Sequence, residues 1–143
     1  MPYDVRQLLD SSQAELDQIF AKGEPKPIPN GEGKGTAIVA PGTKFSHEIA
    51  SLVNIFAWQG KVFDASAGVL KNHISAFGLT AILAKVYTGP SWLDGKDCIV
   101  LDYSHTSVVA QWIRDEIRLI SPGLYLGKVY WEKKRLIDFS LQF

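Results

Sequence analysis

The sequence predicts an α+β, β-rich single domain: a curved antiparallel sheet or small barrel with about three helices packed at its opening or side. After position 35, most of the 143 residues fall into short apolar or alternating segments, separated by turn residues and joined by short connections. Three other segments repeat apolar residues every three or four positions, as helices do. Sequential strands with short links favour an antiparallel meander over parallel βαβ units. A flat sheet with helices packed on one face is the alternative.

The N-terminal residues 4–21 are predicted to form an amphipathic helix, with Asp17 on its polar side. Asp4 can cap the start of this helix, and Gly23 can end it. Residues 23–35 contain three prolines and four glycines, which favour an extended backbone with tight turns. We expect a linker that lays the first helix across the rest of the structure.

The middle of the chain alternates predicted strands with one more helix. The strands are expected at residues 35–40, 60–64, 70–77, 79–87 and 97–103. Residues 46–58 have helical periodicity, and Ser46 can cap their start. Asp94-Gly95 is a hairpin turn signal between the last two of these strands.

A third helix is predicted over residues 107–120, and it carries a glutamate where an apolar residue is expected. At about 100° per residue, one half of the cylinder is apolar. Its members are Val108, Val109, Trp112, Ile113, Ile117, Leu119 and Ile120. Glu116 lies near the middle of this half, whereas Asp115 points away. A carboxylate aimed at a core is costly unless it is paired, hydrogen-bonded or protonated, so such a placement often marks a site.

The last twenty residues read as a β-hairpin, with strands over residues 124–131 and 135–143 and a charged turn over 132–134. Both faces of this hairpin are apolar. It is therefore expected to be covered on both sides, as a barrel wall beneath helices would be, or to meet another subunit. The whole is one domain, 1–143, made of a helix (1–22), a linker (23–35) and a barrel-like body (36–143).

Three short motifs carry a resemblance to a known family. They are Trp58-Gln-Gly-Lys-Val-Phe-Asp64, Ile99-Val-Leu-Asp-Tyr103 and Gly123-Leu-Tyr-Leu-Gly-Lys-Val129. In this order the chain resembles small bacterial lipocalin-like proteins, which carry a Gly-x-Trp-x-Gly element and then a Trp-x-Gly-Lys-x-Phe element. Gly33-Lys34-Gly35 lacks the tryptophan of the first element. The resemblance implies a lipocalin-like β-barrel that could hold an apolar ligand, and it implies no particular activity.

Composition excludes several classes of function. Fifteen basic residues balance fifteen acidic ones, and the pI is about 6.8, so no nucleic-acid partner is expected. The single cysteine, Cys98, excludes an intrachain disulfide and a Cys-cluster zinc site. No apolar run approaches the roughly 18 residues that span a bilayer, and the start lacks a secretory signal. We expect a cytoplasmic protein with no membrane span.

No metal or cofactor is predicted either. The three histidines, His47, His73 and His105, are far apart and lack metal-ligand spacing. The glycine-rich segment 31–35 precedes a strand rather than a helix, so it does not form a phosphate loop.

Candidate catalytic residues are Glu116, Asp102 and His105. Glu116 in an apolar cavity could exchange protons, with its pKa raised by desolvation. The alternative is structural: Glu116 lies at a rim or pairs with Lys85, Lys128 or Arg135. Asp102 and His105, at a strand-to-helix junction, could orient one another, with Tyr103 supplying a hydroxyl. These residues are equally ordinary for a turn and a helix cap.

Aromatic residues supply the candidate ligand contacts: Tyr103, Trp112, Tyr125 and Trp131. Aromatic rings with polar tips suit a core, or an apolar pocket with a few hydrogen-bond donors. The predicted function is therefore to bind a small apolar or amphipathic molecule, such as a fatty acyl or isoprenoid group, inside the barrel. One alternative is an acid–base enzyme (cyclase, isomerase or hydratase-like) that uses Glu116. Another is a homodimeric interaction module, in which Tyr125 and Trp131 form the interface.

Overall fold

A computed structural model of the chain describes residues 3–39, 61–72, 82–104 and 112–143. The elements in these ranges are α1 (Val5–Leu9), α2 (Gln13–Ala21), β1 (Gly31–Ile38), β2 (Lys61–Asp64), β3 (Val69–Asn72), β4 (Ile82–Pro90), β5 (Asp97–Asp102), β6 (Ile113–Ser121), β7 (Leu124–Trp131) and β8 (Lys134–Gln142).

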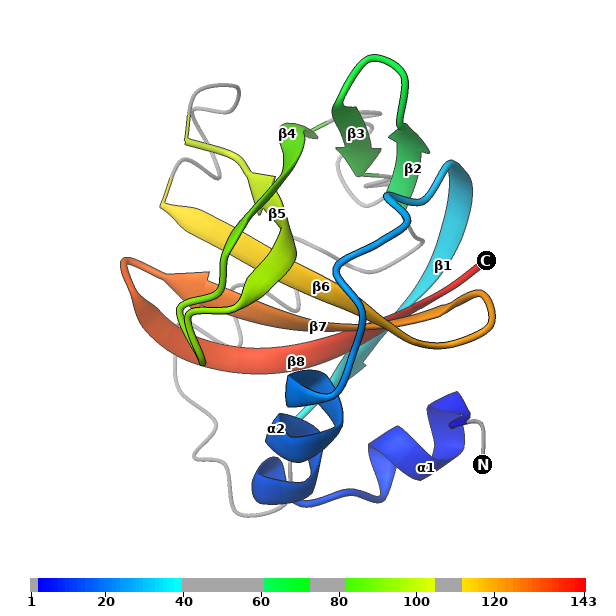
Figure 1. Cartoon of the computed structure of the whole chain (residues 1–143), viewed down its shortest axis with the longest axis vertical. Coiled ribbons are helices and arrows are strands. Elements are labelled where there is room, and N and C mark those ends of the chain that lie inside the picture. Colours follow the sequence, from blue (N-terminus) through cyan, green and yellow to red (C-terminus); the bar gives the residue numbers. More distant parts are fainter. Residues whose placement is uncertain (1–2, 40–60, 73–81, 105–111) are drawn as a thin grey trace.

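The eight strands form a closed antiparallel barrel in sequence order (Figure 1). β1 closes it, since residues Gly31 to Gly33 pair with β2 and Lys34 to Ile38 pair with β8. The three C-terminal strands are joined by short turns, and Gly123 turns β6 into β7 at φ 71°. The predicted β-rich, barrel-like architecture is confirmed.

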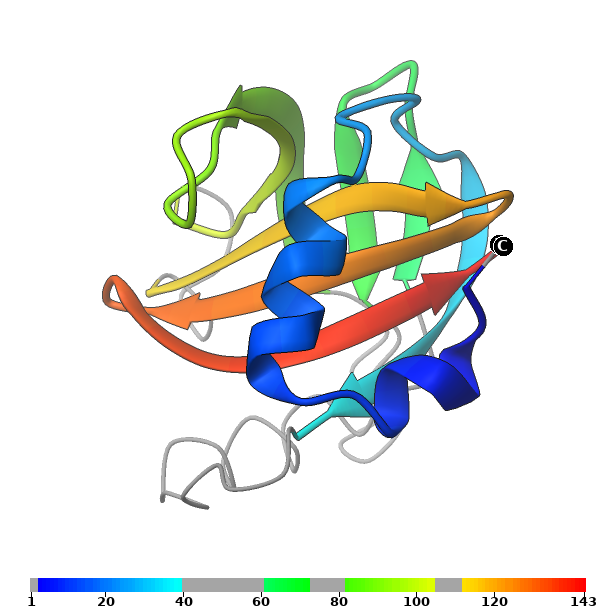
Figure 2. The ribbon, with the colours of Figure 1, turned by 60° about the horizontal axis from the view of Figure 1, so that its bottom comes forward.

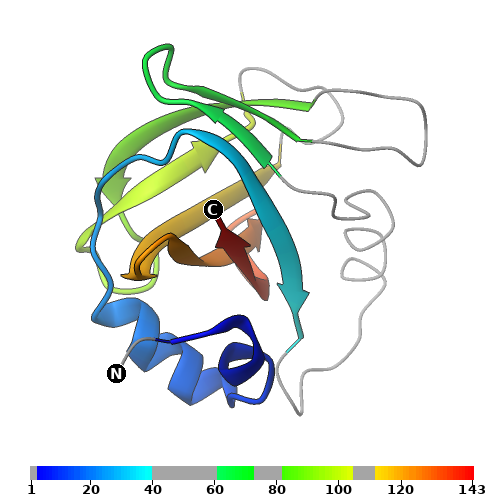
Figure 3. The same ribbon diagram turned by 90° about the vertical axis from the view of Figure 1, so that its right-hand side faces the viewer.

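Both helices lie on the outside of the barrel. α2 crosses the outer face of β6, β7 and β8 (Figure 2), and α1 lies beside it on the same side of the molecule (Figure 3). Each helix starts at a capping box, Asp4 with Gln7 and Ser12 with Glu15, which satisfies backbone N–H groups at the first turn. The single helix predicted over 4–21 is therefore two helices, because Ser12 caps the start of a second one.

Strand alternation gives the barrel wall two apolar layers. The inner layer faces the barrel interior and contains Phe63, Val86, Ile99, Leu101, Tyr103, Ile113, Ile117, Tyr125, Val129, Ile137, Phe139 and Leu141. The outer layer is covered by the helices and contains Leu8, Leu16, Phe20, Ile38, Cys98, Val100, Leu124 and Leu126. Because β5 to β8 are buried on both faces, they lack the apolar–polar alternation of a half-exposed strand.

Aromatic rings fill one end of the barrel, where the linker before β1 meets the C-terminus. We call this the linker end. The Tyr125 hydroxyl donates to the Pro27 carbonyl at 2.7 Å, and the Phe143 ring meets the rings of Phe63 and Tyr125 edge to face. A Cβ on Gly127 would lie 2.2 Å from the Phe139 ring. Glycine is therefore required for β7 to pass this ring.

The third predicted helix, 107–120, is wrong for the residues that the structure describes. Ile113–Ser121 is β6, which pairs with β7 along most of its length and with β5 from Arg114 to Ile117. Charged residues stand at outward-facing positions of this strand, although these positions are covered. The remaining apolar residues therefore fall at a spacing that resembles that of a helix. Ser121-Pro122-Gly123, read as a helix stop, belongs to the turn between β6 and β7.

Other predicted elements need smaller corrections. Residues 31–35, assigned to the linker, begin β1, so the barrel starts earlier than predicted. Within the described residues, the strands predicted at 60–64, 70–77, 79–87 and 97–103 overlap β2–β5, with β4 continuing to Pro90, and the C-terminal hairpin is confirmed. The predicted helix over 46–58 lies outside the described residues.

Cys98 provides a test of the outer layer. Its side chain is fully buried, and burial, with a smaller effect from the Glu116 charge, raises the pKa of its thiol to about 12. We expect Ellman's reagent at pH 8 to label native Cys98 at least about a hundredfold more slowly than the denatured chain, because only the exposed thiolate reacts. Labelling kinetics with and without denaturant measure this.

The control is a Cys98→Ala chain carrying Lys133→Cys, which puts the thiol in an exposed turn. It should react at the denatured rate in both states. Native Cys98 labelling within a few-fold of that rate would contradict the buried position.

Candidate functional site

Glu116 is buried, but on the outer face of β6 rather than in the barrel. Its carboxylate accepts hydrogen bonds from the Ser91 hydroxyl at 2.6 Å and the Trp92 backbone N–H at 2.8 Å. The Arg114 guanidinium lies 3.1 Å away on the same strand. Both oxygens thus hold the loop between β4 and β5 against the wall. This matches the structural alternative stated for Glu116, with Arg114 as its partner in place of Lys85, Lys128 or Arg135.

Arg118 fastens the same loop and the end of α2. Its five N–H groups all have acceptors: both carboxylate oxygens of Asp94 at 2.8 Å, and the carbonyls of Phe20, Lys96 and Asp97 at 3.0–3.1 Å. The hydrogen bonds from Arg118 lower the pKa of the Asp94 carboxyl. An arginine that is 1% exposed is tolerable here because no donor is left unpaired.

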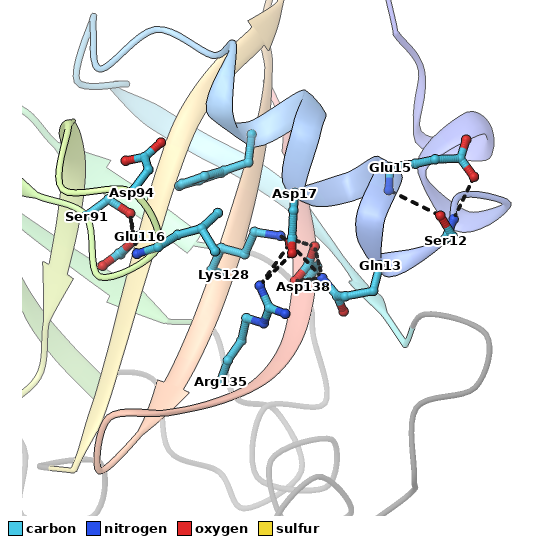
Figure 4. A network of polar contacts seen from close by, with 12 residues as sticks. Ser12, Gln13, Glu15, Asp17, Ser91, Asp94, Glu116, Lys128, Arg135 and Asp138 are labelled. Carbon is cyan, nitrogen blue, oxygen red and sulfur yellow. Dashed lines mark hydrogen bonds and ion pairs between the residues drawn. The ribbon is translucent and has the colours of Figure 1, made fainter.

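A second charged cluster lies beneath α2 (Figure 4). The Lys128 ammonium, fully buried, contacts Asp138 at 2.7 Å and Asp17 at 2.6 Å, and Asp17 also binds Arg135 at 2.9 Å. Burial raises the pKa of the Asp138 carboxyl despite Lys128. Burial would also raise the pKa of Asp17, but hydrogen bonds and charge from Lys128, with Gln13 and Arg135, lower it overall. Asp17, placed on the polar side of the first helix, therefore anchors that helix to the barrel.

Among the residues that the structure describes, the carboxylate that faces the barrel interior is Asp115. Cross-strand register places five side chains in one ring around the inner wall: Val86, Leu101, Asp115, Val129 and Ile137. Asp115 is 2% exposed, and the buried Tyr103 hydroxyl lies 3.4 Å from its Oδ2 atom. This pair lies toward the barrel end opposite the linker end, where β5 stops and β6 begins. We call it the Tyr103 end.

The other predicted site residues are spread over different parts of the barrel. Tyr125 lies at the linker end, whereas Trp131 stacks on Trp112 at the Tyr103 end with ring centroids 6.3 Å apart. Asp102 lies on the outer wall, where it accepts hydrogen bonds from the Tyr87 hydroxyl and from Ser104. His105 lies outside the described residues. The structure brings Tyr103, Trp112 and Trp131 to one end and separates Glu116 from them by the wall.

Sequence reasoning missed Asp115 because it assumed helical phase. In a strand, alternation places Ile113, Asp115 and Ile117 on one face and Glu116 on the other. Two signals favoured a strand: the β-branched isoleucines, and Pro122-Gly123 as a hairpin turn before residues 124–131.

Neither helix in the described ranges has the length and apolarity needed to cross a membrane. Within the same ranges, no three His, Cys, Asp or Glu side chains gather so that they could hold a metal ion.

Comparison with known proteins supports the fold. No protein-family model and no curated protein matches the chain. A crystal structure of a protein from Thermomonospora curvata is similar, with a TM-score of 0.63 at 16% identity over 93% of this chain and 88% of that chain. At this identity the likeness shows the fold alone.

Proposed function

We propose that the protein binds a small amphipathic molecule inside the barrel at the Tyr103 end. The supporting observation is the inner ring of five side chains, in which Asp115 is the charged member among Val86, Leu101, Val129 and Ile137. An eight-stranded barrel is wide enough to be filled by side chains or to hold one small ligand. The linker end is filled by rings, so the ligand is assigned to the other end.

The polar pair defines which headgroup would fit. The Asp115 carboxylate accepts hydrogen bonds, and the Tyr103 hydroxyl can donate or accept one. A hydroxyl or amine can therefore bind both groups while its chain packs on the apolar ring. A fatty acid fits less well, because two carboxylates at one site repel each other. Of the ligands expected from the sequence, fatty acyl or isoprenoid molecules, those that end in a hydroxyl are favoured over a fatty acid.

The alternatives lose support from the geometry. An acid–base enzyme on this barrel would use Asp115 and Tyr103, since both oxygens of Glu116 are occupied on the outer wall. A dimer through Tyr125 would need this residue outside, but it points inward and is 3% exposed.

A matched pair of amphiphiles tests the proposal. We expect 1-octanol to bind more tightly than octanoate by calorimetric titration, because only the alcohol can donate to Asp115. Tyr103→Phe should weaken octanol binding about fivefold, which corresponds to one hydrogen bond of about 1 kcal/mol. Asp115→Asn should remove the preference for the alcohol.

The matched control is Tyr87→Phe, which removes a hydroxyl from the exposed outer wall. Glu116→Gln is a second control on the outer face. Both should bind octanol as the wild type does. Equal losses in Tyr103→Phe and Tyr87→Phe, or no binding of either amphiphile, would reject the interior site.

A further inference from the structure

Two exposed tryptophans border a small cleft at the Tyr103 end of the barrel. The cleft has a volume of about 200 Å³ and is lined by Trp92, Asp102, Ser104, Trp112, Ile113 and Arg114. Trp92 is 45% exposed and Trp112 is 48% exposed, which is unusual for the largest aromatic side chain. Neither the fold nor the interior site requires this exposure.

Both indoles are held in place by contacts on one side. Trp112 stacks on Trp131 at an interplanar angle of 24°. Trp92 lies under the Arg114 guanidinium at 4.4 Å and against the Tyr130 ring at 5.2 Å, and its backbone N–H is fixed by Glu116. Rings fixed in this way bind a ligand at a lower cost in conformational entropy than mobile ones.

The cleft also has polar lining residues. Asp102 and Arg114 are register partners on β5 and β6, and both line the cleft with the tryptophans. Arg114 uses its Nε and Nη2 atoms for Glu116 and the Pro90 carbonyl. Its Nη1 group takes part in none of these hydrogen bonds and can donate to a ligand.

The charges and contacts of the cleft exclude several ligand classes. An anion is disfavoured because Glu116 neutralises Arg114 and Asp102 adds a negative charge. A cation is disfavoured because Arg114 already covers the Trp92 ring. A purely apolar molecule would cover the polar groups of Asp102 and Arg114 without offering them a hydrogen-bond partner. The remaining class is a neutral ring with an apolar face and several hydroxyls on its edge.

We propose that this cleft binds a neutral sugar, as a single pyranose ring. The C–H face of the ring packs on the exposed Trp112 indole beside Trp92, and its edge hydroxyls donate to Asp102 and accept from Arg114. The small volume admits one ring, either free or at the end of a glycan. This site does not depend on the proposed interior ligand.

The test uses the four indole N–H signals of the protein in a two-dimensional NMR titration. Methyl glycosides of glucose, galactose, mannose and N-acetylglucosamine are the probes, and glycerol is the polyol without a ring. We expect at least one glycoside, and not glycerol, to shift the Trp92 and Trp112 signals in a saturable way. Trp112→Ala should lower the affinity for this glycoside at least about tenfold, a factor equivalent to about 1.4 kcal/mol.

Two controls separate the cleft from general effects. Leu9→Ala changes an equally exposed apolar residue on α1 and should leave the affinity unchanged, as should Tyr103→Phe in the interior. Trp112→Phe should bind the glycoside more tightly than Trp112→Ala does, because a smaller aromatic face remains. The proposal is overturned if no glycoside gives saturable shifts, or if binding survives in Trp112→Ala. A proline-rich peptide that shifts the same signals while every glycoside is silent would also overturn it.

Discussion

Replacing Arg118 with methionine is expected to lower the free energy of unfolding by about 3–5 kcal/mol, the range for breaking a buried ion pair from one side. The methionine fills similar volume but donates nothing to Asp94 or to the carbonyls of Phe20, Lys96 and Asp97. Leaving buried acceptors unsatisfied costs more than the bonds themselves contribute. Urea denaturation followed by tryptophan fluorescence measures the change.

The matched control is Arg6→Met, an exposed arginine on α1, which should change stability by less than about 0.5 kcal/mol. Hydrogen exchange localises the effect: in Arg118→Met, the amides at the end of α2 and in residues 91–96 should lose protection first. A loss below about 1 kcal/mol would show that the guanidinium does not hold these segments together.

The same contact makes stability depend on pH, in a direction that follows from Asp94. Its folded-state pKa lies below the unfolded value of 3.8 because Arg118 stabilises the charged form. The unfolded chain therefore takes up a proton first as pH falls. The stabilisation is complete above pH 3.8 and is lost as pH falls through the lower folded pKa. Asp94→Asn should remove this part of the acid sensitivity.

Replacing Lys128 with methionine is expected to have a similarly large effect, about 3–5 kcal/mol at pH 7, because it leaves Asp138 buried without its cation. Asp138 is 1% exposed and cannot turn to solvent. Burial raises the folded-state pKa of Asp138 above its unfolded value, so the carboxyl can escape this cost by binding a proton. The loss in Lys128→Met should therefore shrink as pH falls toward 4. Chemical denaturation at several pH values measures both quantities.

Two further variants distinguish charge from packing. Lys128→Met with Asp138→Leu should recover most of the lost stability, since a buried pair replaced by apolar residues is often neutral. Arg135→Met removes the partly exposed partner of Asp17 and should cost at most about 1 kcal/mol. If the double variant were as unstable as Lys128→Met alone, the loss would come from packing rather than from an unpaired charge.

The buried charges of this protein serve two different purposes according to the face of the wall. On the outer face, Glu116, Arg118 and Lys128 join parts of the chain that lie far apart in sequence, and each is paired with a side chain of opposite charge. On the inner face, Asp115 stands with Tyr103 in an apolar ring. The energetically costly carboxylate of Glu116 thus did point to buried charge in this segment. The carboxylate that faces the interior, however, belongs to its neighbour Asp115.

Local periodicity and turn residues were sufficient to predict the β-rich class, the C-terminal hairpin and the N-terminal amphipathic segment. The sequence pattern also indicated that Glu116 is buried, although for a mistaken reason. The conformation of residues 113–121 depends instead on tertiary contacts. This strand is covered on both faces, by the barrel interior and by α2 with the loop before β5, so its sequence lacks the alternation that identifies a strand. The strand conformation determines which carboxylate faces the interior, because neighbouring residues of a strand point to opposite faces of the sheet.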